Sequence, residues 1–428
     1  MPKAAAAGFV GALLEWYDFY IFATGAALVF GQVFFPGHDP VARTMAAFGA
    51  FAAGFLARPL GGFIFGHIGD RLGRKTSLIA TLVIIGIGTF LIGLLPGYAA
   101  IGPAAPILLV ILRVLQGIGL GGEYGGASLI AIEHAPRSRR GFWGSLPQAA
   151  SPGGLLLATG VFSLSALLPH DAFMAWGWRI PFLLSAVMLA VGLYVRLSIS
   201  ETPDFIATAE QTTALPAMQL LRTHKRSAIL ATGARLAETV AGNMIKSFGL
   251  TYVTVALGLG AATALGAQMA TAAVGLVVTP LFGLLGDRFG RRQTYMAGAA
   301  FAALLAFPFF WLLGMRTDLA VWVGFIIVYN LGPTLMLSVQ PSFFAELFAP
   351  RVRYTGLSVA YQVSSIVGGF TPLAALWLLQ VNGNRPWLVA AMIAAVGVLS
   401  FICAAVSQGR LPAAESASRA AARSVPVA

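Results

Sequence analysis

The sequence predicts an all-α integral membrane protein with twelve transmembrane helices in two six-helix halves. Of its 428 residues, 58% are hydrophobic and only 10% are charged, and the mean hydropathy is +0.83. Soluble domains carry about 25% charged residues, so most of this chain must be embedded in lipid. In addition, its apolar runs are long enough to cross a bilayer, and a charged motif recurs at about half the chain length.

The apolar runs give the expected helices in order, at about 20 apolar residues per crossing. Their approximate spans are 8–34, 44–68, 76–96, 104–131, 142–168, 177–198, 227–257, 264–286, 293–314, 319–347, 355–381 and 387–407. The longest polar interval separates six helices from six. We therefore expect an N-terminal half at 1–199, a cytoplasmic central loop at 200–226, a C-terminal half at 227–407 and a cytoplasmic tail at 408–428. No interval is long enough for a catalytic domain, which argues against an enzyme.

A cluster of glycine and charge between two apolar runs occurs twice. Gly66–Lys75 reads GHIGDRLGRK and Gly283–Arg292 reads GLLGDRFGRR, with the aspartates 217 positions apart. A second pair of segments, PRSR at 136–139 and PRVR at 350–353, is 214 positions apart. Matches at a nearly constant offset indicate an internal repeat, and parallel repeats of this kind are a recurring plan among transporters.

The basic residues are divided unevenly between the two sides of the predicted membrane. With the N-terminus inside, nineteen of the 27 Lys and Arg residues lie on the inner side, four on the outer side and four within helices. The positive-inside bias therefore predicts that both termini are cytoplasmic. It also accounts for the net charge of +12 without any binding of nucleic acid, because the basic residues lie in short loops between apolar runs.

Eight Asp, Glu, Lys and Arg residues fall within the predicted helices and away from their ends, where a charge costs a few kcal/mol unless it faces a cavity or a partner. They are the acids Glu15, Asp18, Glu123 and Glu238 and the cations Arg58, Arg113, Arg235 and Lys246. Four acids against four cations form a balanced set, as pairing would require. These residues are the first candidates for a functional site.

The first predicted helix carries two of the acids on one face, because Glu15 and Asp18 lie three residues apart. A carboxylate in a dry cavity is easily protonated, so both are candidates for carrying a proton or contacting a substrate. The alternative is that one of them only ties this helix to Arg58 or Arg113.

The fourth predicted helix is rich in glycine, which leaves a surface free of side chains for the close approach of a neighbouring helix. Arg113, Gln116 and Glu123 fall on or near one face of this helix. They are candidates for the same site as the acids of the first helix, and Glu123 is with Asp18 a candidate for carrying the proton, tuned by Arg113. The alternative for Arg113 is a structural ion pair with Glu123 or Asp18.

The seventh predicted helix carries Arg235 and Glu238, three residues apart, and Asn243. At 100° per residue, Lys246 returns to within about 20° of the face of Arg235. This cation face, opposite the carboxylates of the first helix, could hold an anion between the halves. Lys246, about 16 Å along the helix, could attract an anion or contact a second acidic group. The alternative is that Arg235 and Glu238 pair only with each other.

Further polar side chains lie on the fifth, tenth and eleventh predicted helices. Each of them lines a cavity or forms hydrogen bonds between helices, as polar groups in lipid must. They are Gln148, Tyr329, Asn330, Gln340, Tyr361 and Gln362. Gln148 and Ser151 match Gln362 and Ser365 in the repeat, 214 positions apart. The histidines lack the spacing of metal ligands, so we expect neither a metal site nor a catalytic triad.

The repeated motif, G-x-x-x-D-R-x-G-R-[KR], resembles the loop between the second and third helices of major facilitator superfamily transporters. In that family a degenerate copy recurs between helices eight and nine. Arg58–Gly62, GGEYGG at 121–126, Trp176–Phe182 and Glu201–Pro203 resemble the metabolite:proton symporter branch of the superfamily. This branch includes transporters for shikimate, α-ketoglutarate, citrate, and proline with glycine betaine. Arg235–Glu238 looks most like the shikimate transporters, whereas Lys246 departs from them.

This resemblance implies uptake of a small organic anion, such as shikimate or a di- or tricarboxylate, by proton symport. It implies alternating access at a site between the halves, with the arginine of helix four, Arg113, linked to proton transfer. It further implies that ion pairs of the repeated motif latch one state and that Gly66 permits close helix contact. The latch residues are then Gly66, Asp70, Arg71, Gly73, Arg74, Asp287, Arg288, Gly290 and Arg291.

The expected partners are the small-molecule substrate, protons and the lipid of a bacterial inner membrane. We expect a monomer that needs no cofactor beyond the proton gradient. Two other functions stay open. One is an exporter that works by proton antiport, although exporters of this superfamily carry Gly-Pro-x-x-Gly-Gly on helix five and Ser151–Gly154 lacks that spacing. The other is a symporter of the proline or betaine type.

Overall fold

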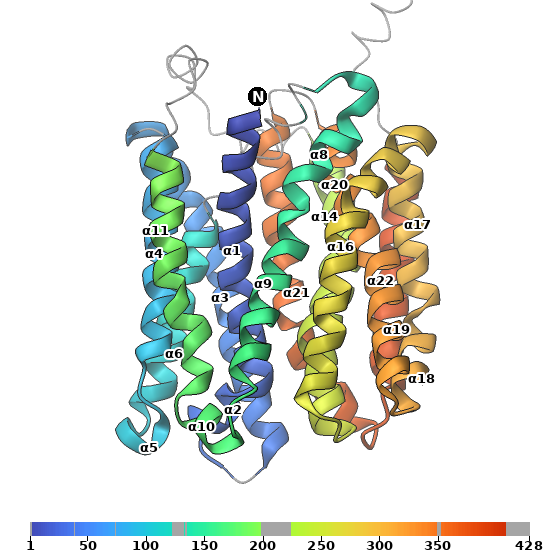
Figure 1. Ribbon diagram of the computed structural model, residues 1–428. Helices are drawn as coiled ribbons and strands as arrows, with labels where there is room; N and C mark the ends of the chain where they lie inside the picture. Colours follow the sequence, from blue (N-terminus) through green and yellow to red (C-terminus); the bar gives the residue numbers. More distant parts are fainter. Residues whose placement is uncertain are drawn as a thin grey trace, which may run out of the picture.

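The computed structural model describes residues 2–37, 39–72, 74–121, 132, 135–197, 224–348 and 352–407. Within these residues every regular element is a helix. The long helices run side by side in one bundle (Figure 1). The all-α fold predicted from composition is therefore confirmed.

Six helical stretches build the first half, in the order that the apolar runs predict. They are α1 (Pro2–Leu28), α3 (Pro40–Leu72), α4 (Arg74–Leu94), α6 (Ala104–Gly121), the consecutive α8 (Arg140–Gln148) and α9 (Ala150–Ser165), and α11 (Ile180–Leu197). Short helices lie between them: α2 (Phe30–Val33), α5 (Tyr98–Ile101), η1 (Arg137–Arg139), α10 (His170–Ala175) and η2 (Gly177–Arg179). The predicted fourth helix continues beyond Gly121 into residues that lie outside the described part.

Six further stretches build the second half. They are α14 (Lys225–Asn243) continued by η3 (Met244–Phe248), α15 (Gly249–Thr251) and η4 (Tyr252–Ala256); α16 (Ala261–Phe289); α17 (Arg291–Leu304) with α18 (Ala306–Gly314); α19 (Asp318–Tyr329) with η5 (Asn330–Thr334) and α20 (Leu335–Ala345); α21 (Arg353–Val381); and α22 (Trp387–Val406). Across the described ranges, the helical stretches thus match the twelve predicted from sequence.

Eight helices of the described chain are long and apolar enough to cross a membrane, and a ninth is the pair α17 and α18, bent by 44°. The eight lie in α3, α4, α6, α11 with η2, α16, α19 with α20, α21 and α22. The other three stretches are α1, α8 with α9, and α14 with its continuations. They carry Glu15, Asp18, Gln148, Arg235 and Lys246. Polar groups at membrane depth face protein or a cavity, so these helices are placed to build a site.

Three segments have π-helical hydrogen bonding, η3 and η4 in the seventh stretch and η5 in the tenth. A π segment adds residues to a turn and so shifts the face on which later side chains lie. Lys246 lies inside η3, and Asn330 begins η5. The prediction that Lys246 shares the face of Arg235 assumed an unbroken 100° step, and the π segment breaks that assumption.

Glycines let α6 and α3 come into main-chain contact. A Cβ added at Gly117 would overlap the carbonyl of Gly54, and one added at Gly121 would overlap the carbonyl of Arg58. The predicted role of the glycines in the fourth helix is therefore confirmed, since any side chain at these positions would push the helices apart.

The two halves pack against each other through α1, α3, α8 and α9 on one side and η3, α16, α20 and α21 on the other. Gly141 of α8 contacts Asp287 near the end of α16. This end of the bundle also holds the N-terminus (Figure 1) and the end of α22, where Arg292 donates to the carbonyl of Ala404 at 3.0 Å. We call it the motif end.

Candidate functional site

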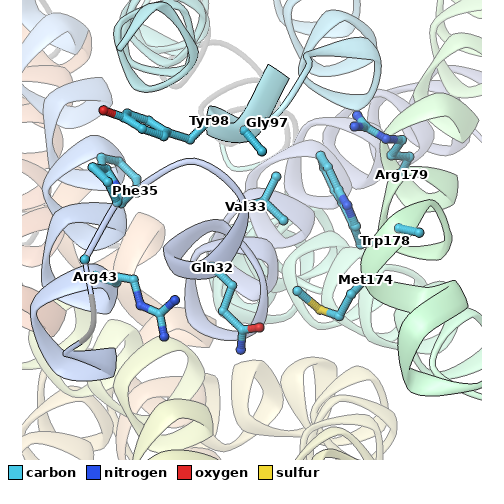
Figure 2. A pocket seen from close by; sticks show the side chains of 13 residues that line it. Gln32, Val33, Phe35, Arg43, Gly97, Tyr98, Met174, Trp178 and Arg179 are labelled. Atoms are coloured by element: carbon cyan, nitrogen blue, oxygen red, sulfur yellow. The ribbon is translucent and has the colours of Figure 1, made fainter. Parts of the chain in front are cut away.

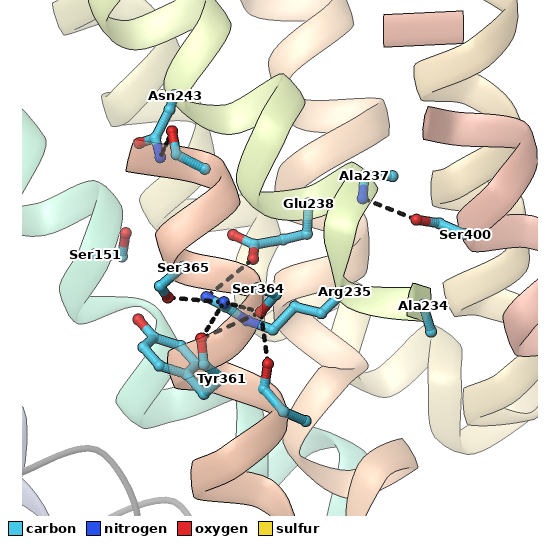
Figure 3. A network of polar contacts seen from close by, with 12 residues as sticks. Ser151, Ala234, Arg235, Ala237, Glu238, Asn243, Tyr361, Ser364, Ser365 and Ser400 are labelled. Carbon is cyan, nitrogen blue, oxygen red and sulfur yellow. Dashed lines mark hydrogen bonds and ion pairs between the residues drawn. The ribbon is translucent and has the colours of Figure 1, made fainter. Parts of the chain in front are cut away.

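An arginine network joins α14 to α21 in the second half (Figure 3). Arg235 Nη1 donates to the Tyr361 carbonyl at 3.0 Å and to the hydroxyls of Ser364 and Ser365 at 2.6 and 2.9 Å. Its Cζ lies 3.6 Å from the centre of the Tyr361 ring. Arg235 Nη2 is 3.3 Å from Glu238 Oε2, and both side chains are buried. The predicted ion pair exists, but it is not self-contained, because the arginine also binds α21.

A second arginine reaches the same tyrosine from the first half. Arg58 of α3 is buried, and its Cζ lies 4.3 Å from the centre of the Phe55 ring. The Tyr361 side chain is its hydrogen-bonding neighbour, and Glu15 of α1 interacts electrostatically with both Arg58 and Tyr361. Tyr361 therefore lies between one arginine of each half.

The lysine of η3 crosses the boundary between the halves. Lys246 Nζ donates to the hydroxyl of Tyr20 on α1 at 3.0 Å. That hydroxyl also forms a hydrogen bond of 2.6 Å with Ser151 of α9, and Tyr329 of α19 lies beside it. Lys246 thus contacts α1 of the first half, and it also interacts electrostatically with Arg235 and Glu238 of its own helical stretch.

A polar chain inside the first half links Asp18 to Arg113. Arg113 Nη1 donates to Gln116 Oε1 at 3.3 Å, and Gln116 Nε2 donates to the hydroxyl of Thr89 at 2.7 Å. Thr89 is the side-chain hydrogen-bonding neighbour of Asp18. Asp18 and Arg113 are only 5% and 1% exposed. Three helices, α1, α4 and α6, hold this chain between the carboxylate and the guanidinium.

Aromatic rings surround the Arg113 guanidinium. Its Cζ lies 4.2 Å from the ring centre of Phe22 and 5.0 Å from that of Phe51. Among the described residues no ion pair joins Arg113 to Asp18. The proposed alternative of a direct pair with Asp18 is therefore wrong for this structure. Glu123, the other suggested partner, lies outside the described residues.

Several predicted amides bind main chain between or within helices. Asn243 donates to the carbonyl of Gly368 at 2.9 Å, Asn330 to that of Thr271 on α16 at 3.3 Å, and Gln362 to that of Gly121 at 3.1 Å. The bond from Gln362 joins α21 to α6 across the two halves. Gln148, Tyr329 and Gln340 are buried. For Asn243, Asn330 and Gln362 the structure supports the alternative of hydrogen bonding between helices.

At the motif end, the second copy of the repeated motif ties the halves together. Asp287 accepts hydrogen bonds from the main-chain N–H groups of Gly141 and Phe142 at 2.8 and 2.9 Å. These groups begin α8, where unpaired N–H groups and the helix dipole attract an anion. Arg291 pairs with Asp287 at 2.9 Å and with Glu346 at 2.6 Å. This is a contact between halves of the kind that a latch requires.

Two glycines of the same copy have distinct structural roles. Gly283, the repeat partner of Gly66, packs on α8, and an added Cβ would overlap Ser145. Gly290 has a φ of 99°, in the region that favours glycine, and ends α16. Arg288 is exposed and lies over the Phe289 ring at 5.5 Å, and it takes part in none of the ion pairs among the described residues. The predicted side-chain contacts of Asp70, Arg71, Gly73 and Arg74, and that of Gly66, fall outside the described part of the chain.

A cavity of about 450 Å³ lies in the first half at the end opposite to the motif end (Figure 2). Its lining includes Gln32, Arg43, Tyr98, Trp178 and Arg179. The Arg179 guanidinium has a structural role, because it donates hydrogen bonds to the carbonyls of Gly93 and Leu95 at 2.9 and 2.8 Å. None of the predicted substrate residues lines this cavity, so it is separate from the site between the halves.

Prediction from buried charge missed the hydroxyl groups of the site. Tyr20 accepts a hydrogen bond from Lys246 and is itself bonded to Ser151, Ser364 and Ser365 accept from Arg235, and Thr89 lies beside Asp18. A signal for two of them was present, because Ser151 and Ser365 occupy equivalent positions of the repeat. In both halves this serine lies in the polar network around a buried cation.

The family model described as sugar (and other) transporter matches residues 4–227 and again residues 207–408. The shikimate transporter of Escherichia coli strain K12 is 41% identical over 391 residues, covering 89% of each chain. An inner membrane metabolite transport protein of the same strain is 44% identical over 393 residues, covering 89% of this chain and 88% of its own.

Among solved structures, a D-xylose-proton symporter superposes with a TM-score of 0.75 at 20% identity, over 95% of this chain and 99% of its own. The fold of the two proteins is therefore the same. These matches span both halves of the chain and concern membrane transporters, not enzymes. The chain belongs to the sugar (and other) transporter family of the major facilitator superfamily.

Proposed function

We propose that this chain is a proton-coupled symporter that takes up a small organic anion, such as a shikimate-like monocarboxylate or a di- or tricarboxylate. It works as a monomer in a bacterial inner membrane, driven by the proton gradient and without a cofactor. The motif end, where α1 begins and α22 ends, faces the cytoplasm, as the positive-inside bias predicts. The shikimate transporter of Escherichia coli, 41% identical to this chain, has a name that agrees with this substrate class.

The charges around Tyr361 carry the proposal. Arg58, Arg235 and Lys246 bring three cations to the boundary between the halves, and Glu15 and Glu238 bring two carboxylates. The surplus of one positive charge suits an anion, and protonation of a carboxylate increases the surplus. A cation from each half therefore allows a bound anion to draw the halves together, which is what couples binding to alternating access.

Transport into proteoliposomes tests this function. The purified chain is reconstituted, a proton gradient is imposed, and uptake of radiolabelled shikimate, α-ketoglutarate, citrate, glycine betaine and xylose is measured. We expect accumulation of at least one carboxylate, accompanied by proton entry and abolished by an uncoupler. Accumulation of only the sugar, or proton-driven extrusion of the carboxylates, would contradict the proposal.

The contact of Asp287 with α8 predicts the effect of loosening the latch. An Asp287→Asn variant keeps an acceptor but loses the charge that strengthens the bonds to Gly141 and Phe142 and the pairing with Arg291. We expect transport to slow about ten-fold or more, because one state is destabilised by about 1–3 kcal/mol. Asp70→Asn should slow transport at least as strongly.

Accessibility separates this prediction from general damage. In a Cys403→Ser background, a cysteine replacing the buried Ser145 should react several-fold faster with a thiol reagent when Asp287→Asn is added. An Asp318→Asn variant is the matched control, since Asp318 is an exposed aspartate whose bond to Thr263 lies within the second half. Unchanged transport and unchanged labelling in Asp287→Asn would reject the latch.

The orientation is tested with single cysteines in the same Cys403→Ser background. His224 precedes α14 at the motif end, and Asp171 lies in α10 at the opposite end. An impermeant thiol reagent applied to intact cells should label a cysteine at Asp171 and should reach one at His224 only after the cells are opened. Labelling of position 224 from outside would show that the orientation is reversed.

A further inference from the structure

Aromatic rings hold the ammonium group of Lys246. Its Nζ lies 4.7 Å from the ring centre of Tyr20, 5.5 Å from that of Tyr329 and 5.9 Å from that of Trp16. It donates a hydrogen bond of 3.0 Å to the Tyr20 hydroxyl. In the described part of the chain no carboxylate forms an ion pair with it within 4.0 Å. Rings at these distances around a cation form an aromatic cage.

The rings of this cage are positioned by contacts of their own. Trp16 and Tyr20 on α1 stack with 5.4 Å between ring centres and an interplanar angle of 19°. The Tyr20 hydroxyl is held by Ser151 at 2.6 Å, and Tyr329 comes from α19 in the other half. Tyr20 and Tyr329 are 1% and 3% exposed, so a cation between them interacts in a poorly hydrated site, where such contacts are strongest. The cage should therefore persist when the lysine is shortened.

We infer that this cage is a binding site for an ammonium head group that the protein fills with its own Lys246, which makes Lys246 a specificity-determining residue. A ligand with a methylated ammonium group would have to displace a tethered cation, whose effective concentration in the cage is very high. Placing both cations in the same buried space would cost several kcal/mol of like-charge repulsion. The inference rests on the proposed function only in placing the substrate site at this boundary.

The size of the lysine indicates which ligand would replace it. Shortening Lys246 to alanine removes the atoms beyond Cβ, which match in number the nitrogen and methyl carbons of a trimethylammonium group. The same change removes one of the cations at the boundary and leaves Glu238 and Glu15 in place. Shape, ring contacts and charge then all favour a methylated ammonium ligand.

Binding of radiolabelled glycine betaine, a trimethylammonium carboxylate, to the purified protein in nanodiscs tests the inference. We expect the Lys246→Ala variant to bind it about ten-fold or more tighter than the parent chain, whereas Lys246→Arg, which keeps a cation in place, should show no gain. Adding Trp16→Ala to Lys246→Ala should weaken binding again by about ten-fold, the effect of one desolvated ring. Tetramethylammonium should show the same pattern, which separates the head group from the carboxylate.

Two outcomes would overturn the inference. One is that Lys246→Ala, with a melting temperature like that of the parent, gains no affinity. The other is that the gain survives the loss of Trp16. If Lys246→Ala does not fold, Lys246→Ser gives the same comparison. The assay uses neither a proton gradient nor an organic anion. The binding experiment can therefore succeed when carboxylate uptake by the parent chain fails, and it can fail when carboxylate uptake succeeds. The two proposals are therefore tested separately.

Discussion

An Arg235→Gln variant will bind the transported anion about a hundred-fold more weakly than the parent chain. The guanidinium is held in place by Tyr361, Ser364 and Ser365, so it is preorganised to pair with a carboxylate. Removing one partner of a buried charge pair costs about 2–5 kcal/mol, and every 1.4 kcal/mol corresponds to about ten-fold in affinity. Equilibrium binding to the purified variant measures this loss directly.

Folding is the main confounding effect, because Arg235→Gln leaves Glu238 buried without its cation. The double variant Arg235→Gln/Glu238→Gln removes both charges and should recover the melting temperature without recovering affinity. Arg179→Gln is the matched control, since Arg179 also donates to main-chain carbonyls but lies at the opposite end, outside the site. Unchanged anion affinity in a folded Arg235→Gln variant would show that this arginine serves only to join α14 to α21.

The helices and the repeat could be predicted from the sequence because they depend on local pattern. Apolar length sets each crossing, and the copied motif indicates that Gly283 and Asp287 serve the same structural purpose as Gly66 and Asp70. The partner of Asp287 could not be predicted in this way. It is the main chain at the start of α8, more than a hundred residues away, and unpaired N–H groups at a helix start carry no signal in residue type.

The site residues were predicted from buried charge, and this criterion does not detect uncharged partners. For Arg113 the alternative to a role in proton transfer was an ion pair with Glu123 or Asp18, but its guanidinium lies against Phe22 and Phe51, whose ring faces attract a cation although they carry no charge. Lys246 was predicted to share the face of Arg235 from a regular step of 100° per residue. The π segment at Met244–Phe248 depends on packing, so that step could not predict the contact of Lys246 with Tyr20.

An Asp18→Asn variant will lose proton-driven accumulation of substrate, although it still exchanges substrate across the membrane. Asp18 is 5% exposed, and its Oδ1 has no hydrogen-bond partner among the described residues. This oxygen is available to hold a proton, and Thr89 and Gln116 connect the carboxyl group to Arg113. A proton bound at Asp18 can thus change the polar chain that packs α1 against α4 and α6. Asparagine has nearly the same shape as aspartate but cannot take up that proton. The variant can therefore still alternate between its two states, but the proton gradient no longer drives this change.

Two assays on the same proteoliposomes distinguish coupling from damage. In Asp18→Asn, uptake driven by a proton gradient should only equalise the substrate concentrations on the two sides of the membrane. The rate of counterflow of labelled against unlabelled substrate should stay within about three-fold of the parent rate, which corresponds to less than about 1 kcal/mol. Asp318→Asn, on the surface of the second half, should leave both rates unchanged. Glu123→Gln tests the second candidate carboxylate. If Asp18→Asn and Glu123→Gln each still accumulate substrate against its gradient, the proton is carried by another group. If Asp18→Asn instead loses both accumulation and counterflow, Asp18 serves in substrate binding or structure.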